Sequence, residues 1–132
     1  VKDDKGDIYV GPTERHVLGR AVEEQTARAV TQMMEATVVN GTSFGTFHDR
    51  AGRAFLKDIR VAGKTGTLEG KGYLFTWWVG FAPADDPEIA LSVLVANRGD
   101  WKVKGTQTAS DMLRVYFADK GHKGVIDPIG AK

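Results

Sequence analysis

Residues 75–81 read Phe-Thr-Trp-Trp-Val-Gly-Phe, and this stretch decides the fold class. Side chains on a β-strand point alternately to its two faces. One face of the stretch carries Phe75, Trp77, Val79 and Phe81. The adjacent Trp77 and Trp78 then lie on opposite faces, and we expect both to pack in the core. The alternation predicts a β-strand.

Strand-like sequence lies on both sides of this stretch. A short run at 60–67 precedes it, and residues 89–97 form a run rich in β-branched and aliphatic residues. The connections at 69–72 (Glu-Gly-Lys-Gly) and 83–87 (Pro-Ala-Asp-Asp-Pro) are short and consist of turn-forming residues. Because short turns join antiparallel neighbours, the sequence predicts a three-stranded antiparallel meander.

A helix is predicted before the meander, over residues 23–40. Its apolar residues recur at helical spacing, and we assign this stripe to the core: Val30, Met33, Met34 and Val38. We expect Gly41 to end the helix in a left-handed conformation. Residues 42–58 read as a loop whose Phe44, Phe47 and Phe55 pack onto the body. At the N-terminus, residues 2–10 predict a short hairpin with Gly6 in its turn.

A second helix is predicted after the meander, where apolar residues again recur at helical spacing: Ala109, Met112, Leu113, Tyr116 and Phe117. Thr106 or Thr108 is expected to cap its start, and Lys120-Gly121 suits its end. The predicted fold class is therefore α+β: an antiparallel meander with a helix before it and a C-terminal helix packed on the sheet, in one domain over residues 1–132.

Composition excludes several kinds of partner. The 132 residues carry 18 Lys and Arg against 17 Asp and Glu, and a net charge of +1 implies no nucleic acid or anionic membrane. Cysteine is absent, and the three histidines, His16, His48 and His122, have no metal-ligand spacing, so neither a metal nor a cofactor is expected. No apolar stretch is long enough to span a bilayer. Residues 1–5 (Val-Lys-Asp-Asp-Lys) lack an apolar signal region, and we expect a fragment of a longer chain.

The candidate binding and catalytic residues lie together at 61–67, Val-Ala-Gly-Lys-Thr-Gly-Thr. A phosphate-binding loop is one interpretation of Gly63-Lys64-Thr65. That loop needs a glycine five residues before Gly63 and a helix directly after it. Asp58 holds the glycine position, and a turn and a strand follow instead of a helix, so this interpretation fails.

The other interpretation is a strand edge that lines an acyl-transfer site. A cation at Lys64 and hydroxyl groups at Thr65 and Thr67 can hold a carboxylate of the substrate. Gly66 lets a peptide approach the strand closely, and a free backbone N–H on an exposed edge can point at a developing oxyanion. The alternative is a turn-rich strand with no catalytic role, and the four-residue motif alone does not separate the two.

The wider sequence favours the acyl-transfer interpretation. Lys64-Thr65-Gly66-Thr67 resembles the Lys-Thr-Gly motif of penicillin-binding proteins and serine β-lactamases. Residues 34–42, ending in Asn-Gly-Thr, resemble the helix end and turn before that strand in transpeptidases. Residues 77–83 (Trp-Trp-Val-Gly-Phe-Ala-Pro) and 106–117 resemble the following strand and the terminal helix. The amino-acid sequence of these segments is most similar to that of class B, monofunctional D,D-transpeptidases.

The resemblance implies roles for four residues of this motif. Lys64 would bond the serine of the family's middle motif and set the electrostatics of the site. Thr65 and Thr67 would bind the terminal carboxylate of a stem peptide or of a β-lactam, with Gly66 between them. The backbone N–H of Thr67 would supply half of an oxyanion hole.

The sequence departs from the family in one large respect. The family needs Ser-x-x-Lys for the acylated serine and Ser-x-Asn in its middle motif. The only serines are Ser43, Ser92 and Ser110, and none has Lys three positions later or Asn two positions later. We therefore expect the isolated chain to be inactive. Trp101 lies in a polar loop, where we expect it to anchor the loop; contact with a partner or substrate is the alternative.

The resemblance implies part of a peptidoglycan D,D-transpeptidase, with stem peptides ending in D-Ala-D-Ala and β-lactams as its partners and no cofactor. It also implies a place in the cell envelope, on the periplasmic side of the inner membrane, with membrane attachment only through an upstream segment. A serine β-lactamase, a β-lactam sensor and a non-catalytic interaction module on the same scaffold stay open as alternatives. An open, apolar edge on the strand at 89–97 predicts self-association of the fragment.

Overall fold

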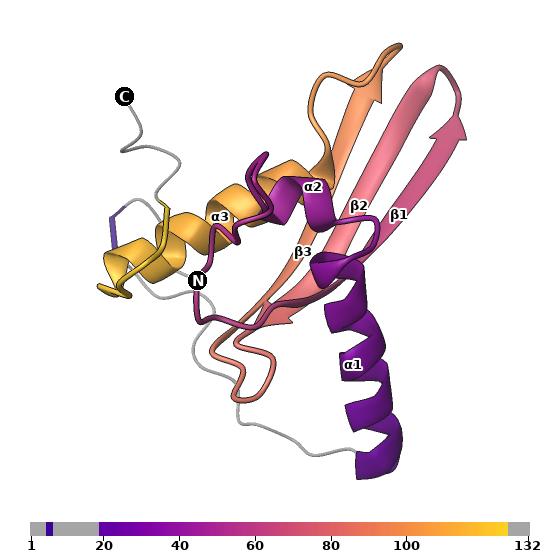
Figure 1. Cartoon of the computed structure of the whole chain (residues 1–132). Helices are drawn as coiled ribbons and strands as arrows, with labels where there is room; N and C mark the ends of the chain where they lie inside the picture. The colour runs from indigo at the N-terminus through magenta and orange to yellow at the C-terminus, as the bar shows by residue number, and fades with distance from the viewer. Residues whose placement is uncertain (1–4, 7–18, 127–132) are drawn as a thin grey trace.

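A three-stranded sheet and three helices make up the described part of the chain (Figure 1). The computed structural model describes residues 5–6 and 19–126. Its elements are α1 (Glu24–Val39), α2 (Phe44–Phe47), β1 (Ala62–Gly70), β2 (Tyr73–Ala82), β3 (Ile89–Arg98) and α3 (Gly105–Asp119). Most of the hairpin predicted at 2–10, and also His16, lie outside the described residues. None of the described helices combines the length and the apolar character that crossing a membrane requires.

The strands form the predicted antiparallel meander, in the order β1-β2-β3. Gly70 pairs with Tyr73, so the first turn has only two residues, Lys71 and Gly72. Both take positive φ, 52° and 75°, as in the tight turns whose twist matches that of a hairpin. The α+β class and the meander are confirmed.

The two faces of this sheet differ in what covers them. The inner face carries Thr76, Trp78, Ala82 and Val93, all buried. The outer face carries Leu68, Phe75, Trp77, Val79, Phe81 and Leu94, all at least partly exposed. Buried residues of all three helices join the cluster around Trp78, which places the core on the inner side alone: Val38, Phe47, Ala109, Leu113 and Phe117.

Trp78 is the centre of this core. Its side chain is 0% exposed and its ring stacks on Phe47, with 5.6 Å between ring centroids. The indole lies over two paired glycines, Gly63 and Gly80, where added Cβ atoms would come within 2.2 Å and 2.4 Å of its ring carbons. The prediction of a core position is thus right for Trp78. It is wrong for Trp77, which is half-buried on the outer face, where no described helix packs.

Helix α3 packs on the sheet as predicted, with three fully buried side chains, Ala109, Leu113 and Phe117. Its C-terminal end is confirmed too, since Lys120 is the C-cap and Gly121 follows with φ +77°. The predicted start is wrong. Lys104 is the N-cap, without a side-chain cap bond, and the first backbone N–H of the helix, that of Gly105, donates to Oγ1 of Thr76 at 2.8 Å. A strand residue therefore does what a local Thr was expected to do.

Helix α1 differs most from expectation. Of its apolar stripe only Val38 is buried, whereas Met34 is half-buried, and Val30 is 44% and Met33 62% exposed. Gly41 is not left-handed. Its lack of a side chain matters because the chain passes close to α1 here, and a Cβ would lie 2.7 Å from Cα of Thr37.

The segment predicted as loop, 42–58, contains the short helix α2 and takes part in two isolated β-bridges, His48 to Ala54 and Leu56 to Val125. Phe47 packs in the core as expected, Phe55 is half-buried, and Phe44 is 37% exposed. The ring of Phe44 instead stacks on that of His48 at 4.2 Å.

Candidate functional site

The Lys-Thr-Gly-Thr stretch lies in the middle of β1, which has β2 on one side and an open edge on the other within the described sheet. Two contacts hold the end of α1 against this strand. Oγ1 of Thr37 donates to the backbone carbonyl of Gly63, and the guanidinium of Arg60 makes two 2.8 Å bonds to the carboxylate of Glu35. These contacts fix where the motif begins relative to α1.

The backbone at Thr67 faces the open edge. In an antiparallel strand the N–H and C=O of one residue point to the same side, and the side alternates along the strand. Because the carbonyl of Gly63 is bonded to α1, away from β2, the backbone groups of Thr65 and Thr67 point outward as well. The N–H of Thr67 is therefore directed away from β2, as an oxyanion-hole donor requires.

The side chains of the motif divide between the two faces. Thr65 and Thr67 share a face with Trp78, whereas Lys64 and Gly66 share the outer face with Trp77. Nζ of Lys64 bends back to the strand and donates to the backbone carbonyl of Thr65 at 2.7 Å. The structure thus places the two predicted hydroxyl groups together, with the predicted ammonium group directed to the backbone beside them.

A pocket of about 280 Å³ opens beside these hydroxyl groups. We call it the threonine pocket, and its lining residues are Thr42, Thr65, Gly66, Thr67, Thr76, Trp77, Trp101, Lys104 and Thr106. Oγ1 of Thr42 lies 2.9 Å from Oγ1 of Thr65, so the turn after α1 and the motif strand share one hydrogen bond. The pocket has the small size and the converging hydroxyl groups of a site for a polar chain end.

Sequence reasoning missed half of this pocket. The sequence contained a signal for a role of Thr42, because this residue ends the Asn-Gly-Thr turn that precedes the motif strand. Lys104 and Thr106 had none, since they reach the pocket through the packing of α3 on β2, which no local pattern records. Trp101 is 50% exposed and lines the pocket, and its loop is held by hydrogen bonds to the buried side chain of Asn97.

Three serines fall outside this site. Ser43 and Ser110 are 0% exposed, so their hydroxyl groups cannot reach a substrate in this structure. Ser92 is on the outer face of β3, opposite the face of Thr65 and Thr67. Within the described ranges no group of three or more His, Cys, Asp or Glu could hold a metal ion.

Comparisons with known proteins agree with this geometry. The family model described as the penicillin binding protein transpeptidase domain matches residues 3–114. Stage V sporulation protein D of Bacillus subtilis is 36% identical over 99 residues, which is 68% of this chain and 14% of that protein. Peptidoglycan D,D-transpeptidase PbpA of Mycolicibacterium smegmatis is 35% identical over 86 residues, 61% of this chain and 16% of that protein.

Solved structures agree as well. The D,D-transpeptidase domain of a peptidoglycan glycosyltransferase from Eggerthella lenta superposes with a TM-score of 0.63 at 31% identity, over 91% of this chain and 26% of that one. The transpeptidase domain of FtsI4 from Legionella pneumophila gives 0.56 at 26% identity, over 76% of this chain and 37% of that one. The chain thus spans a minor part of each relative's length. It belongs to the penicillin binding protein transpeptidase domain family.

Proposed function

We propose that residues 1–132 are the C-terminal portion of a peptidoglycan D,D-transpeptidase, an acyltransferase that cross-links stem peptides ending in D-Ala-D-Ala and is trapped by β-lactams. The observation that supports this most is the placement of the hydroxyl groups of Thr65 and Thr67 in one pocket, on a strand whose backbone N–H groups at the same residues face an open edge. Family membership over residues 3–114 supports the same activity.

The proposed chemistry assigns each motif residue a separate task. A serine outside this chain attacks the carbonyl carbon of the penultimate D-Ala, and the electron pair of the C=O bond moves to its oxygen. The N–H of Thr67 donates to that oxyanion, while the hydroxyl groups of Thr65 and Thr67 hold the terminal carboxylate. Collapse of the intermediate releases the last D-Ala with a proton, and the amine of a second stem then takes the acyl group. Lys64 hydrogen-bonds the serine of the family's middle motif and adds positive charge to the site.

The chain by itself is proposed to be inactive, because it supplies the donor strand and not the nucleophile. The buried positions of Ser43 and Ser110 support this, and so does the lack of a Ser-x-x-Lys sequence anywhere in the 132 residues. A place outside the cytoplasmic membrane, in the cell envelope, is proposed on the same grounds as the substrate, since stem peptides are cross-linked there.

A chimera tests the proposed activity. The segment of PbpA from Mycolicibacterium smegmatis that matches this chain is replaced by the corresponding residues, and the protein is exposed to fluorescent penicillin. We expect a covalent band on a denaturing gel from the chimera and none from this chain alone. A folded chimera that stays unlabelled contradicts the proposal. Label on the isolated chain contradicts the assignment of the nucleophile to another segment.

Two substitutions at one position separate the two tasks of Thr67 in that chimera. Thr67→Pro removes the outward N–H, which an edge strand tolerates, and should slow acylation by about 10²–10³-fold. Thr67→Val keeps the N–H and removes only the hydroxyl, so its main effect should be on the concentration of penicillin needed. Equal acylation rates in the two variants would refute the oxyanion role.

We also propose that the isolated chain self-associates. Strand β3 has no neighbour beyond β2 among the described residues, and its outer face exposes Leu94 by 53%. An unpaired strand with an apolar face is a template for pairing with a second copy. Light scattering should detect a dimer that Leu94→Lys weakens more than Leu68→Lys, which adds the same charge to the same face at β1. A monodisperse monomer at all concentrations refutes the proposal.

A further inference from the structure

The second wall of the threonine pocket comes from the connection between β3 and α3. Trp101, Lys104 and Thr106 line the pocket opposite the motif residues Thr65 and Thr67. The sequence had suggested a substrate contact only for Trp101, as the alternative to a loop anchor. Their positions raise the question of which group in a substrate they would meet.

Buried polar contacts fix this connection in place. The side chain of Asn97 is buried, donates to the carbonyl of Val103 at 2.8 Å, and accepts from the N–H groups of Lys102 and Val103, both at 3.2 Å. The N–H of Gly105 donates to Oγ1 of Thr76 at 2.8 Å. Lys104 thus lies between two anchored residues, and its Cα is fixed relative to β2.

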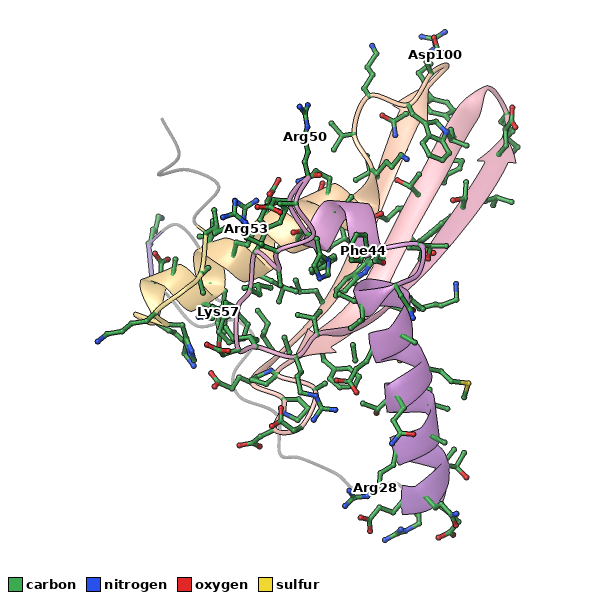
Figure 2. The ribbon with its side chains drawn as sticks, viewed as in Figure 1. Arg28, Phe44, Arg50, Arg53, Lys57 and Asp100 are labelled. Carbon is green, nitrogen blue, oxygen red and sulfur yellow. The ribbon has the colours of Figure 1, made fainter. Side chains whose placement is uncertain are left out.

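Lys104 carries a charge that no described acid neutralises. None of the ion pairs among the described residues includes it, and its Nζ lies 4.1 Å from the centre of the Trp101 ring. Such a cation–π contact positions an ammonium group without cancelling its charge. The one acid of the same loop, Asp100, projects beyond the end of the sheet, away from the pocket (Figure 2). The wall of the pocket therefore includes an exposed positive charge that pairs with no described acid.

Thr106 adds a hydroxyl group that is still available. It is 7% exposed and lines the pocket, yet none of the side-chain hydrogen bonds within the described residues involves its Oγ1. Thr106 is the second residue of α3, whose N-cap makes no side-chain bond. A hydroxyl group that makes no protein hydrogen bond, at a helix start beside a cation, is suited to an anionic ligand.

Lys64 is placed less well for the same task. It lies on the outer face of β1 and its Nζ is bonded to the carbonyl of Thr65, and it is not among the residues that line the threonine pocket. Of these two lysines, only Lys104 lines the pocket that holds the hydroxyl groups of Thr65 and Thr67.

We infer that Lys104, held on Trp101, is the cation that pairs with the carboxylate of a ligand bound by the hydroxyl groups of Thr65, Thr67 and Thr106. The ligand class is a short peptide with a free C-terminal carboxylate. This inference rests on the proposed function, since it names the part of the acyl donor that this pocket takes. It leaves the ammonium group of Lys64 for the serine of the family's middle motif.

The test uses the whole chain and acetyl-D-Ala-D-Ala, with its C-terminal amide as the uncharged analogue. Binding is followed by tryptophan fluorescence and by amide shifts in NMR spectra. We expect the carboxylate form to bind the parent chain and Lys104→Met to weaken that binding about tenfold or more, as loss of a charge-assisted hydrogen bond does. Lys102→Met, which removes one charge from the same loop outside the pocket, should change it little. The uncharged amide should bind Lys104→Met and Lys102→Met equally weakly.

Each other outcome overturns the inference. Unchanged binding of the carboxylate form by Lys104→Met overturns it. A preference for the carboxylate form that is lost in Lys64→Met and in no other variant also overturns it. No binding to the parent chain at millimolar peptide removes the pocket as a carboxylate site. Acetate provides the remaining comparison: if it binds as tightly as the dipeptide and depends equally on Lys104, the anion site stands and the proposed acyl donor does not. Unchanged amide spectra away from the pocket exclude unfolding of a variant.

Discussion

Replacing Gly63 with alanine tests whether the indole of Trp78 positions the strand that carries Lys64, Thr65 and Thr67. The added Cβ would lie 2.2 Å from Cζ2 and 2.4 Å from Cε2 of that ring. The ring has no room to move toward β2 either, because it already lies close to the backbone of Gly80. A Cβ built on that glycine would be within 2.4 Å of the ring. Overpacking of this kind in a core typically costs about 1–3 kcal/mol. We expect Gly63→Ala to lower the free energy of unfolding by that amount.

Urea unfolding, followed by near-ultraviolet circular dichroism, measures the loss. The decisive comparison is a double-mutant cycle with Trp78→Phe, which removes the ring atoms that the new Cβ would meet. In that background Gly63→Ala should cost much less than in the parent. Gly66→Ala is the matched control on the same strand, since its Cβ would meet only Cβ of Trp77 at 3.4 Å. An effect of Gly63→Ala below about 0.5 kcal/mol, or an equal cost in both backgrounds, refutes the reasoning.

Three further predictions concern contacts around the site. Asn97→Ala removes three hydrogen bonds to the backbone of Lys102 and Val103 and should destabilise the chain by about 1–3 kcal/mol, with a changed tryptophan emission; an unchanged spectrum contradicts the anchoring role. Thr37→Val removes the bond to the carbonyl of Gly63 and should raise hydrogen exchange at the start of β1, without affecting α3. The hydrogen bond from Lys120 holds the pKa of Glu88 below its usual range. This pair therefore stabilises the fold at pH values above the usual pKa of a glutamate. The contribution is lost as the pH falls through the lowered pKa. Glu88→Gln should flatten the acid limb of the stability curve, and an unchanged limb contradicts the assignment.

The meander was predictable because its signals are local. Alternation in residues 75–81 and the two-residue turn at Lys71 and Gly72 depend only on neighbours in the chain. The positions of Thr65 and Thr67 on one face follow from the same period of two. The sequence also indicates why position 66 holds a glycine. The need for a glycine at position 63 became clear only from the strand register, which places Gly63 opposite Gly80 and under the ring of Trp78.

The rest of the site depends on contacts between segments distant in sequence. Lys104 reaches the pocket because Oγ1 of Thr76 accepts the hydrogen bond of Gly105, across 29 residues of chain. The same contact explains the wrong prediction of a Thr cap on α3. Periodicity could not supply either result, since it records which side of an element is apolar and not which other element lies there.

The misassigned residues of the core have one physical cause. Met33 and Val30 on α1, and Trp77 on β2, are apolar residues in correctly predicted elements, and each lies outside the buried cluster around Trp78. Periodicity identified their faces correctly and failed only on burial. Both surfaces flank β1, since α1 contacts its beginning and the outer face includes Leu68. Whatever covers them therefore also bears on the strand that presents Thr65 and Thr67. In the isolated chain the inner face alone fixes the geometry of the site, and for that reason the contact of Trp78 with Gly63 is the most sensitive point at which to test it.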